Sequence, residues 1–353
     1  MIKKQINVLI TGVGAPGGVA ILKALKHSNL DIRIVTADMN KKSVGLFFSN
    51  TSYYLPSIKD KSYVERLVKI CIKEKIDIVF IGSEPELRFI LQHVNTVEEK
   101  TGAVFVISRS SLMEACLDKW EMTQLLNYYG FNCPQTTLAS DKDGIKSMIS
   151  KFGFPLFLKP RLGSGSKSTF LIKNLNELKF FTEYVPDAVV QEWLAEDEQE
   201  YTVGVYVSST GDVVGSIVCK RELAAGLTYR AFFDRYPEIS QYCENVADVL
   251  KPLGPFNFQI RMHKKQPYIF EMNPRCSSTT VMRAVLGFNE PEMAILDLVL
   301  GQKIETPNIQ YRTVFRYWDE AYIKGTGKDL TYDDNGEFTL PNAITFPLFN
   351  AEK

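Results

Sequence analysis

The sequence predicts a mixed fold, in which an α/β domain with a parallel sheet is followed by an α+β domain. Short apolar strands alternate with helical patterns over about the first 110 residues, which is typical of a parallel α/β unit. A glycine-rich turn over 12–18 joins the first strand to the first helix, as a tight strand-to-helix turn requires. Strands dominate from 200 to 270, and the last two of them form a hairpin.

In the first domain, short apolar runs indicate the strands, and apolar residues at helical spacing indicate the helices. The predicted strands are 6–11, 31–37, 76–81 and 103–107, and the predicted helices are 19–25, 63–71 and 85–94. We place this domain at residues 1–112.

The second domain begins with helical patterns and then becomes richer in strands. The predicted helices are 112–130, 141–152, 238–252 and 278–300, and the predicted strands include 154–160, 189–194, 256–262 and 268–272. We expect this domain to cover 113–305, with a subdomain at about 134–190. Residues 306–353 then form a C-terminal extension with little regular pattern.

The composition narrows the class of protein. The chain has 353 residues, 45% of them hydrophobic and 23% charged, which is close to the average of globular proteins. A formal net charge of zero gives no electrostatic reason to expect a nucleic-acid or membrane partner. The N-terminus lacks a signal-peptide core, and the six scattered cysteines form no Cys-x-x-Cys pair. We therefore expect neither a zinc site nor a disulfide framework, and a cytoplasmic location.

The predicted hairpin carries the most informative polar residues of the chain. Side chains two residues apart share one face of a strand, so Glu271 and Asn273 point the same way, and Gln259 on the partner strand can join them. Oxygen donors of this kind suit Mg²⁺, which proteins often hold with one or two carboxylates plus substrate phosphates. Arg275 lies just beyond them in the sequence.

This hairpin, with its Glu-Met-Asn-Pro-Arg run, resembles the metal-binding signature of the ATP-grasp superfamily, and of its carbamoyl-phosphate synthetase and biotin carboxylase branch in particular. The resemblance covers roughly residues 5–300. It implies a Rossmann-like pre-ATP-grasp domain followed by a two-subdomain ATP-grasp fold. It also implies ATP and two Mg²⁺ ions as cofactors, with Mn²⁺ able to replace Mg²⁺, and metal ligands Gln259, Glu271 and Asn273.

A lysine followed by a Gly/Ser loop supports the same resemblance. Lys159 ends an apolar strand, and small residues after it let backbone amides approach phosphate oxygens closely. By resemblance, the phosphate contacts are Lys119, Lys159, Gly163, Ser164, Gly165 and Ser166. The adenine and ribose contacts implied in the same way are Glu192, Trp193, Leu194 and Glu200.

Further candidates concern the reaction and the second substrate. Arg275, together with Lys159, is the predicted catalytic residue, because an arginine can neutralise charge on a transferring phosphoryl group. Glu84 follows a strand of the parallel sheet, where it can hold a substrate amine or cap the next helix. Arg221 can face the substrate or be an exposed basic residue.

The glycine turn supports a rival interpretation. Gly12-x-Gly14-x-x-Gly17 after a strand matches the dinucleotide fingerprint, and Asp38 lies at a suitable distance for a ribose. An NAD(P)-dependent oxidoreductase is therefore one alternative. Tight turns also demand glycines, and in the ATP-grasp resemblance this turn, with Gly14, helps to hold the second substrate.

The resemblance implies an ADP-forming ligase that activates a small-molecule carboxylate as an acyl phosphate for attack by an amine. A second alternative is carboxyphosphate chemistry on bicarbonate, and a third is a nucleotide sensor without catalysis. Many members of this superfamily are dimers, so a homodimer is possible.

Overall fold

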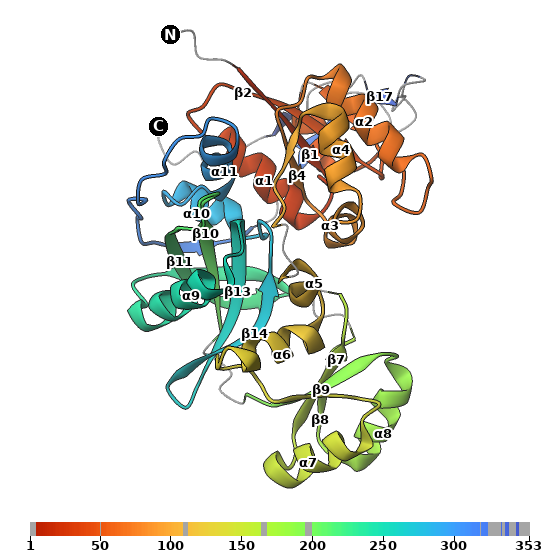
Figure 1. The fold of residues 1–353 in the computed structure, drawn as a ribbon, viewed down its shortest axis with the longest axis vertical. Coiled ribbons are helices and arrows are strands. Elements are labelled where there is room, and N and C mark those ends of the chain that lie inside the picture. Colours follow the sequence, from red (N-terminus) through yellow and green to blue (C-terminus); the bar gives the residue numbers. More distant parts are fainter. Residues whose placement is uncertain are drawn as a thin grey trace. The chain divides into compact units, whose positions relative to one another are not determined.

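The structure, a computed structural model, describes residues 5–49, 51–108, 112–163, 168–194, 200–317, 319–323, 333, 336–338 and 344–345. The chain folds into two compact units (Figure 1). The first unit combines residues 1–107, 275–310 and 315–353, and the second combines 108–274 with 311–314. The domain limits predicted at 112 and 305 stay a prediction.

A parallel sheet forms the centre of the first unit. Its strands are β1 (Ile6–Thr11), β2 (Ile32–Asp38), β3 (Thr51–Tyr54), β4 (Ile78–Ile81) and β5 (Val104–Phe105), in the order β3-β2-β1-β4-β5. The short strand β17 (Glu337–Phe338) pairs antiparallel with β3 at the edge. Val8, Leu9 and Ile10 are fully buried, because a strand in the middle of a parallel sheet is covered on both faces. The sequence patterns did not predict β3, whose Thr-Ser-Tyr-Tyr run shows no apolar alternation.

The first unit also contains helices, and two of them come from a distant part of the chain. The helical elements of the first unit are α1 (Pro16–Lys26), η1 (Val44–Phe48), α2 (Tyr63–Lys73), α3 (Glu84–Ile90), α4 (Val94–Thr101), α10 (Thr280–Val285) and α11 (Glu290–Leu298). Helix α1 packs against α10 and α11. The single helix predicted over 278–300 is wrong: Gly287 adopts a φ of +98°, and the Asn289 side chain caps α11.

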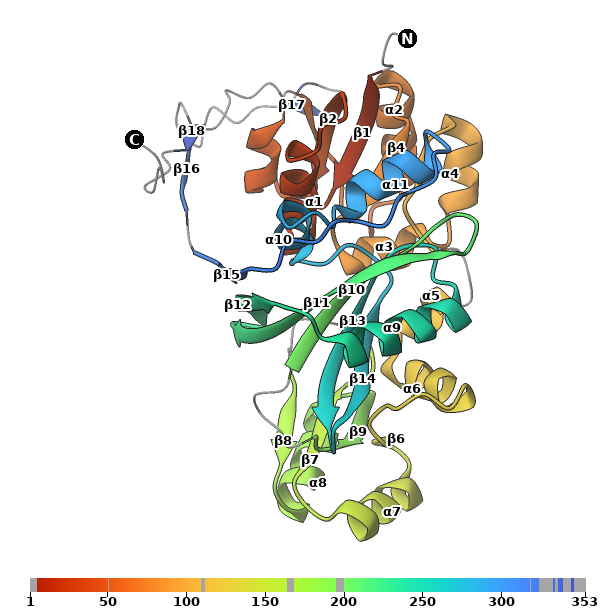
Figure 2. The ribbon, with the colours of Figure 1, turned by 90° about the vertical axis from the view of Figure 1, so that its left-hand side faces the viewer.

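The larger sheet of the second unit has six strands in the order β14-β13-β10-β11-β12-β15. The strands are β10 (Glu200–Val207), β11 (Val213–Ala224), β12 (Leu227–Phe233), β13 (Gly254–His263), β14 (Gln266–Asn273) and β15 (Thr313–Phe315). Helix α9 (Pro237–Leu250) lies along this sheet (Figure 2). Its apolar residues join those of β10, β13 and β14 in one core.

The smaller sheet of the second unit has four antiparallel strands in the order β6-β9-β7-β8. They are β6 (Thr136–Leu138), β7 (Leu156–Pro160), β8 (Phe170–Ile172) and β9 (Ala188–Glu192), with helices α7 (Lys142–Phe152) and α8 (Leu175–Tyr184). Leu156, Leu158 and Ile172 are fully buried and share a core with residues of both helices.

The helix predicted over 112–130 is two helices, α5 (Leu112–Leu117) and α6 (Lys119–Tyr128). The break falls at Asp118, whose carboxylate accepts hydrogen bonds from the amides of Trp120 and Glu121 and so caps α6. Strands β16 (Ala321–Tyr322) and β18 (Ile344–Thr345) form a separate pair. In the described part of the chain, no helix combines the length and the apolar character that a membrane span requires.

Candidate active site

A cavity of about 350 Å³ lies within the second unit. Its walls come from β7 and β9 of the smaller sheet, from β10, β11, β13 and β14 of the larger sheet, and from the start of α6. This volume lies in the range of sites for small-molecule ligands. The residues predicted from the sequence that line it are Lys119, Lys159, Gly163, Glu192, Trp193, Leu194, Glu200, Arg221, Gln259 and Glu271.

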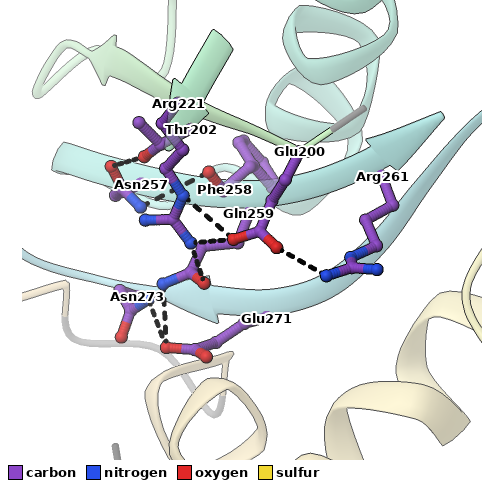
Figure 3. Close-up of polar contacts among 9 residues, drawn as sticks. All are labelled: Glu200, Thr202, Arg221, Asn257, Phe258, Gln259, Arg261, Glu271 and Asn273. Carbon is purple, nitrogen blue, oxygen red and sulfur yellow. Dashed lines mark hydrogen bonds and ion pairs between the residues drawn. The ribbon is translucent and has the colours of Figure 1, made fainter. Parts of the chain in front are cut away.

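The hairpin β13–β14 brings the predicted metal ligands together. Gln259 pairs with Glu271 across the hairpin, and Asn257 pairs with Asn273. The Nε2 atom of Gln259 donates to Oε1 of Glu271 at 3.1 Å, and Nδ2 of Asn273 donates to the same oxygen at 2.9 Å (Figure 3). One carboxylate and two amides thus meet at one point, where the two amide side chains also orient the carboxylate.

A β-bulge in the hairpin provides a hydrogen-bond acceptor for Lys159. The register shifts after Gln259, so that Ile260 pairs with Ile269 and Phe270 has no partner residue on β13. The Phe270 carbonyl instead accepts a hydrogen bond from Nζ of Lys159 at 3.2 Å. The bulge therefore places a backbone acceptor where the buried ammonium group needs one.

Two lysines form the cationic wall of the cavity. Lys159 is only 5% exposed, and Lys119 is 9% exposed with its Nζ 2.6 Å from the Gly163 carbonyl oxygen. Burial lowers the pKa of Lys159 to about 7, and the nearby charges of Lys119 and Arg261 act in the same direction while Glu271 opposes them. An anionic ligand would stabilise the charged form of a lysine that is buried beside other positive charges.

A network of charges crosses the larger sheet (Figure 3). Oε1 of Glu200 accepts from Nε and Nη2 of Arg221 at 3.1 and 2.7 Å, and Oε2 accepts from Nη2 of Arg261 at 2.8 Å. Arg221 also donates to Oε1 of Gln259 at 2.8 Å. The guanidinium of Arg221, which the sequence suggested for the substrate, thus joins Glu200 to the predicted metal ligands.

An aromatic wall closes another side of the cavity. Trp193 stacks on Phe157 with ring centroids 5.6 Å apart, and the Arg261 guanidinium lies 5.2 Å from the Trp193 ring. The Leu194 carbonyl accepts from Nη1 of Arg261 at 3.1 Å. Flat apolar surfaces of this kind suit a purine base.

Glu192 lines the cavity, but its carboxylate has a structural partner. Oε2 accepts a hydrogen bond from the Gln135 amide at 2.9 Å, and Oε1 lies 3.9 Å from Nε2 of His263. The first contact ties the end of β9 to the segment before β6, and the second brings it near the end of β13. The Glu192 side chain therefore has a structural role at the end of β9.

Arg275 and Glu84 belong to the first unit. Nη2 of Arg275 lies 3.8 Å from Oε2 of Glu84, and Oε1 of Glu84 lies 3.6 Å from Nη2 of Arg88. Arg275 also donates to the Cys276 carbonyl at 3.1 Å. Ser164, Gly165 and Ser166 of the predicted phosphate loop lie outside the described residues.

In the glycine turn of the first unit, the space beside the glycines and the Gly14 amide are taken by other groups of the protein. The Gly14 amide donates to Oδ2 of Asp38 at 2.7 Å, and the Asn40 amide donates to Oδ1 at 2.8 Å. A Cβ atom on Gly14 would lie 2.2 Å from Oγ of Ser43, and one on Gly17 would lie 2.8 Å from the Gly82 carbonyl oxygen. Close packing explains these glycines, and the buried Asp38 carboxylate occupies the amide that a pyrophosphate would use.

Several residues of the cavity wall were missed from the sequence, among them Phe157, Arg261 and Phe270. A signal existed for Arg261, which follows Gln259 by two residues and so shares its face of β13. Phe157 and Phe270 sit in apolar strands where nothing distinguishes a cavity-facing residue from a core residue.

Family models match three stretches of the chain. Residues 8–106 match the N-terminal domain of PylC-like proteins, 116–230 match a RimK-like ATP-grasp domain, and 184–321 match an ATP-grasp domain of a biosynthetic pathway with the Ter operon. The last two matches contain all the residues of the cavity wall. They overlap, and together they run through the whole second unit from α6 onward.

The carbamoyl phosphate synthase large chain of Helicobacter pylori is 21% identical over an alignment of 382 residues, which covers 98% of this chain and 33% of that protein. The chain spans a quarter to a third of the length of the first such synthases it matches. Biotin carboxylase from Campylobacter jejuni superposes with a TM-score of 0.70 at 14% identity, covering 97% of this chain and 84% of that one. The N5-carboxyaminoimidazole synthetase from Staphylococcus aureus, in complex with ADP, gives 0.69 at 16% identity and covers 88% and 82%. These two structures show the shared fold, so the predicted fold class is confirmed.

Proposed function

Because the chain belongs to the ATP-grasp superfamily, in the branch of carbamoyl phosphate synthase large chains and biotin carboxylases, we propose that it is an ADP-forming ligase. It activates a carboxylate with ATP and Mg²⁺ and joins it to an amine. One observation carries the proposal: a buried lysine pair and a carboxylate–amide hairpin face the same cavity. That combination suits a triphosphate with its metal.

The reaction has two steps. A carboxylate oxygen of the first substrate attacks the γ-phosphorus of ATP, the bond to the bridging oxygen breaks, and an acyl phosphate and ADP result. The amine nitrogen of the second substrate then attacks the acyl carbon, phosphate leaves with the electron pair of the C–O bond, and the nitrogen loses its proton. Positioning and charge neutralisation are the contributions required from the protein.

Several side chains of the cavity have a proposed part in these steps. Lys119 and Lys159 hold phosphate oxygens, and Trp193 with Phe157 holds the base. Glu200 has both oxygens on arginines, yet a carboxylate accepts about four hydrogen bonds and three are used, so one ribose hydroxyl can be bound.

The hairpin residues fit a divalent cation. Both amide groups donate to Oε1 of Glu271, which leaves Oε2 as the proposed ligand. The amide oxygens of Gln259 and Asn273 are proposed as further hard donors, and that of Gln259 would share its lone pairs between the cation and Nη2 of Arg221. When bound, Mg²⁺ would neutralise charge on the phosphate oxygens. Two ions are proposed from the resemblance, with Mn²⁺ as a substitute.

Three residues of the first unit keep the parts that the resemblance implies. Arg275 is proposed to neutralise the transferring phosphoryl group, and Glu84 with Gly14 is proposed to contribute to the amine substrate. Glu84 has a cation partner in Arg275, so a substrate ammonium group would have to replace or share that contact. A homodimer and a cytoplasmic location also remain proposals, the latter because all six cysteines are buried thiols.

The test begins with thermal unfolding in the presence of ATP or NAD(H), each with and without Mg²⁺. A ligand that binds only the native state adds about 2.7 kcal/mol at 100 times its dissociation constant, which gives a readable shift. We expect stabilisation by Mg-ATP and none by NAD(H). Stabilisation by NAD(H) alone would refute the ligase proposal.

The variant Glu271→Gln tests the metal site with a side chain of nearly the same size, so that an effect on activity can be told apart from an effect on folding. It should abolish ADP formation with any acid and amine pair, since the hairpin would lose its one carboxylate. Glu222→Gln is the matched control, because Glu222 lies on the same sheet in an exposed ion pair with Arg230. ADP formation that depends on bicarbonate alone would indicate carboxyphosphate chemistry, and ATP binding without ADP formation would indicate a sensor.

A further inference from the structure

The start of α6 is bound to the end of β7 by a group of polar contacts. Nε of Arg161 donates to Oδ1 and Oδ2 of Asp118 at 2.9 and 2.8 Å, and the Lys119 amide donates to the Arg161 carbonyl at 3.0 Å. Asp118 and Leu162 also form an isolated β-bridge. The side chains of Asp118 and Arg161 are 13% and 26% exposed, so this ion pair is partly shielded from solvent. We call these two residues the clamp pair.

Asp118 has two tasks in the same place. Its Oδ1 accepts from the amides of Trp120 and Glu121 at 2.9 and 3.3 Å, and it thereby caps α6. The same carboxylate holds Arg161. The cap fixes where α6 begins, and the ion pair fixes where that beginning lies against β7.

The two lysines of the cavity flank the clamp pair. Lys119 follows Asp118 directly, and Lys159 precedes Arg161 by two residues on β7. Each ammonium is held by a backbone carbonyl, that of Gly163 for Lys119 and that of Phe270 for Lys159. Like charges at close range repel, so without an anionic ligand an opposing attachment is needed to keep the two groups together.

We propose that Asp118 and Arg161 are positioning residues, whose ion pair holds Lys119 and Lys159 at the spacing that a nucleoside diphosphate or triphosphate requires. The proposal rests on the proposed function of the cavity as a nucleotide site. It assigns a role in binding to two residues that touch the ligand only through their lysine neighbours. Arg161 also donates to Glu121 at 3.3 Å, but that carboxylate is half-exposed and contributes less.

The test compares a ligand that has both nucleoside and phosphates with one that has only the nucleoside and one that has only the phosphates. Dissociation constants of ADP, adenosine and inorganic pyrophosphate are measured by titration calorimetry for the full chain and for Arg161→Met and Asp118→Asn. Asparagine is as good an N-cap as aspartate, so Asp118→Asn removes the charge and keeps the cap. We expect both variants to bind ADP and pyrophosphate about tenfold more weakly, as for a lost charged hydrogen bond, and adenosine unchanged.

Two further variants complete the design. Arg161→Lys keeps the charge but loses the planar guanidinium that places Nε against both Asp118 oxygens, and it should recover part of the ADP affinity that Arg161→Met loses. Arg230→Met removes an exposed arginine whose partner is Glu222 at 2.7 Å. It should change the dissociation constant of none of the three ligands. Circular dichroism with urea unfolding confirms that each variant is folded.

The outcomes are distinguishable. If the variants bind ADP and adenosine more weakly by the same factor, or if neither affinity changes, the clamp pair has no role in phosphate positioning and the inference is overturned. If the unaltered protein binds pyrophosphate but no adenine nucleotide, the proposed function fails, and the pyrophosphate affinities of the variants still decide the inference. If it binds neither ligand, both ideas are wrong.

Discussion

Replacement of Lys159 by methionine should make the nucleotide-free protein more stable while it removes nucleotide binding. Lys159 is 5% exposed, and burial lowers its pKa to about 7 from the ordinary 10.5. Methionine has similar length and carries no charge, so Lys159→Met removes the desolvation penalty without opening a large cavity.

The size of the effect follows from linkage. Between pH 7 and 10.5 the unfolded chain binds more protons at this residue than the folded chain, so stability increases with pH across this window. The penalty is about 4 kcal/mol at pH 7 and about 2 kcal/mol at pH 9. The variant leaves the Phe270 carbonyl without its lysine donor, which costs about 1–3 kcal/mol at either pH. The net gain is then about 1–3 kcal/mol at pH 7 and near zero at pH 9.

The assay is urea unfolding at both pH values, followed by tryptophan fluorescence. Trp120 and Trp193 lie in the second unit and report on its unfolding. Lys146→Met is the control, since Lys146 is exposed in an ion pair with Asp143, and its effect should not depend on pH over this range. A stability difference between Lys159→Met and the unaltered protein that is the same at pH 7 and pH 9 would refute the reasoning.

Other predictions concern the same lysine, the charge network and the glycine turn. Phosphate binding favours the charged form of Lys159, so above pH 7 ADP binding should take up protons, and calorimetry at pH 8 in two buffers of different ionisation enthalpy should detect this; equal heats would contradict it. Glu200→Gln leaves Arg221 and Arg261 without their shared carboxylate, and it should lower the free energy of unfolding by about 2–3 kcal/mol, somewhat less than for a fully buried pair, as measured in urea. Gly17→Ala would place a Cβ 2.8 Å from the Gly82 carbonyl oxygen, a backbone atom, and should destabilise the first unit by about 1–3 kcal/mol; unchanged hydrogen exchange in β1 and β4 would rule this out.

Much of the fold was predictable because its signals are local. Alternating apolar residues identify β13 and β14, and strand–helix alternation identifies the first unit. The family was also predictable, since its polar residues occur in a characteristic order along the chain. Helix breaks at Asp118 and Gly287 were missed because a capping residue inside an apolar helical pattern looks like part of the helix.

The sequence by itself determined which residue types are present in the candidate site and in what order, because strand periodicity places Gln259, Glu271 and Asn273 on one face. Only the tertiary structure decided what their neighbours do. It places Glu200 between two arginines and buries Lys159 beside a second lysine. It also brings the Gly14 amide into a hydrogen bond with the Asp38 carboxylate. These contacts join residues far apart in the chain, and burial, charge and hydrogen bonding over such separations depend on packing that no local pattern contains.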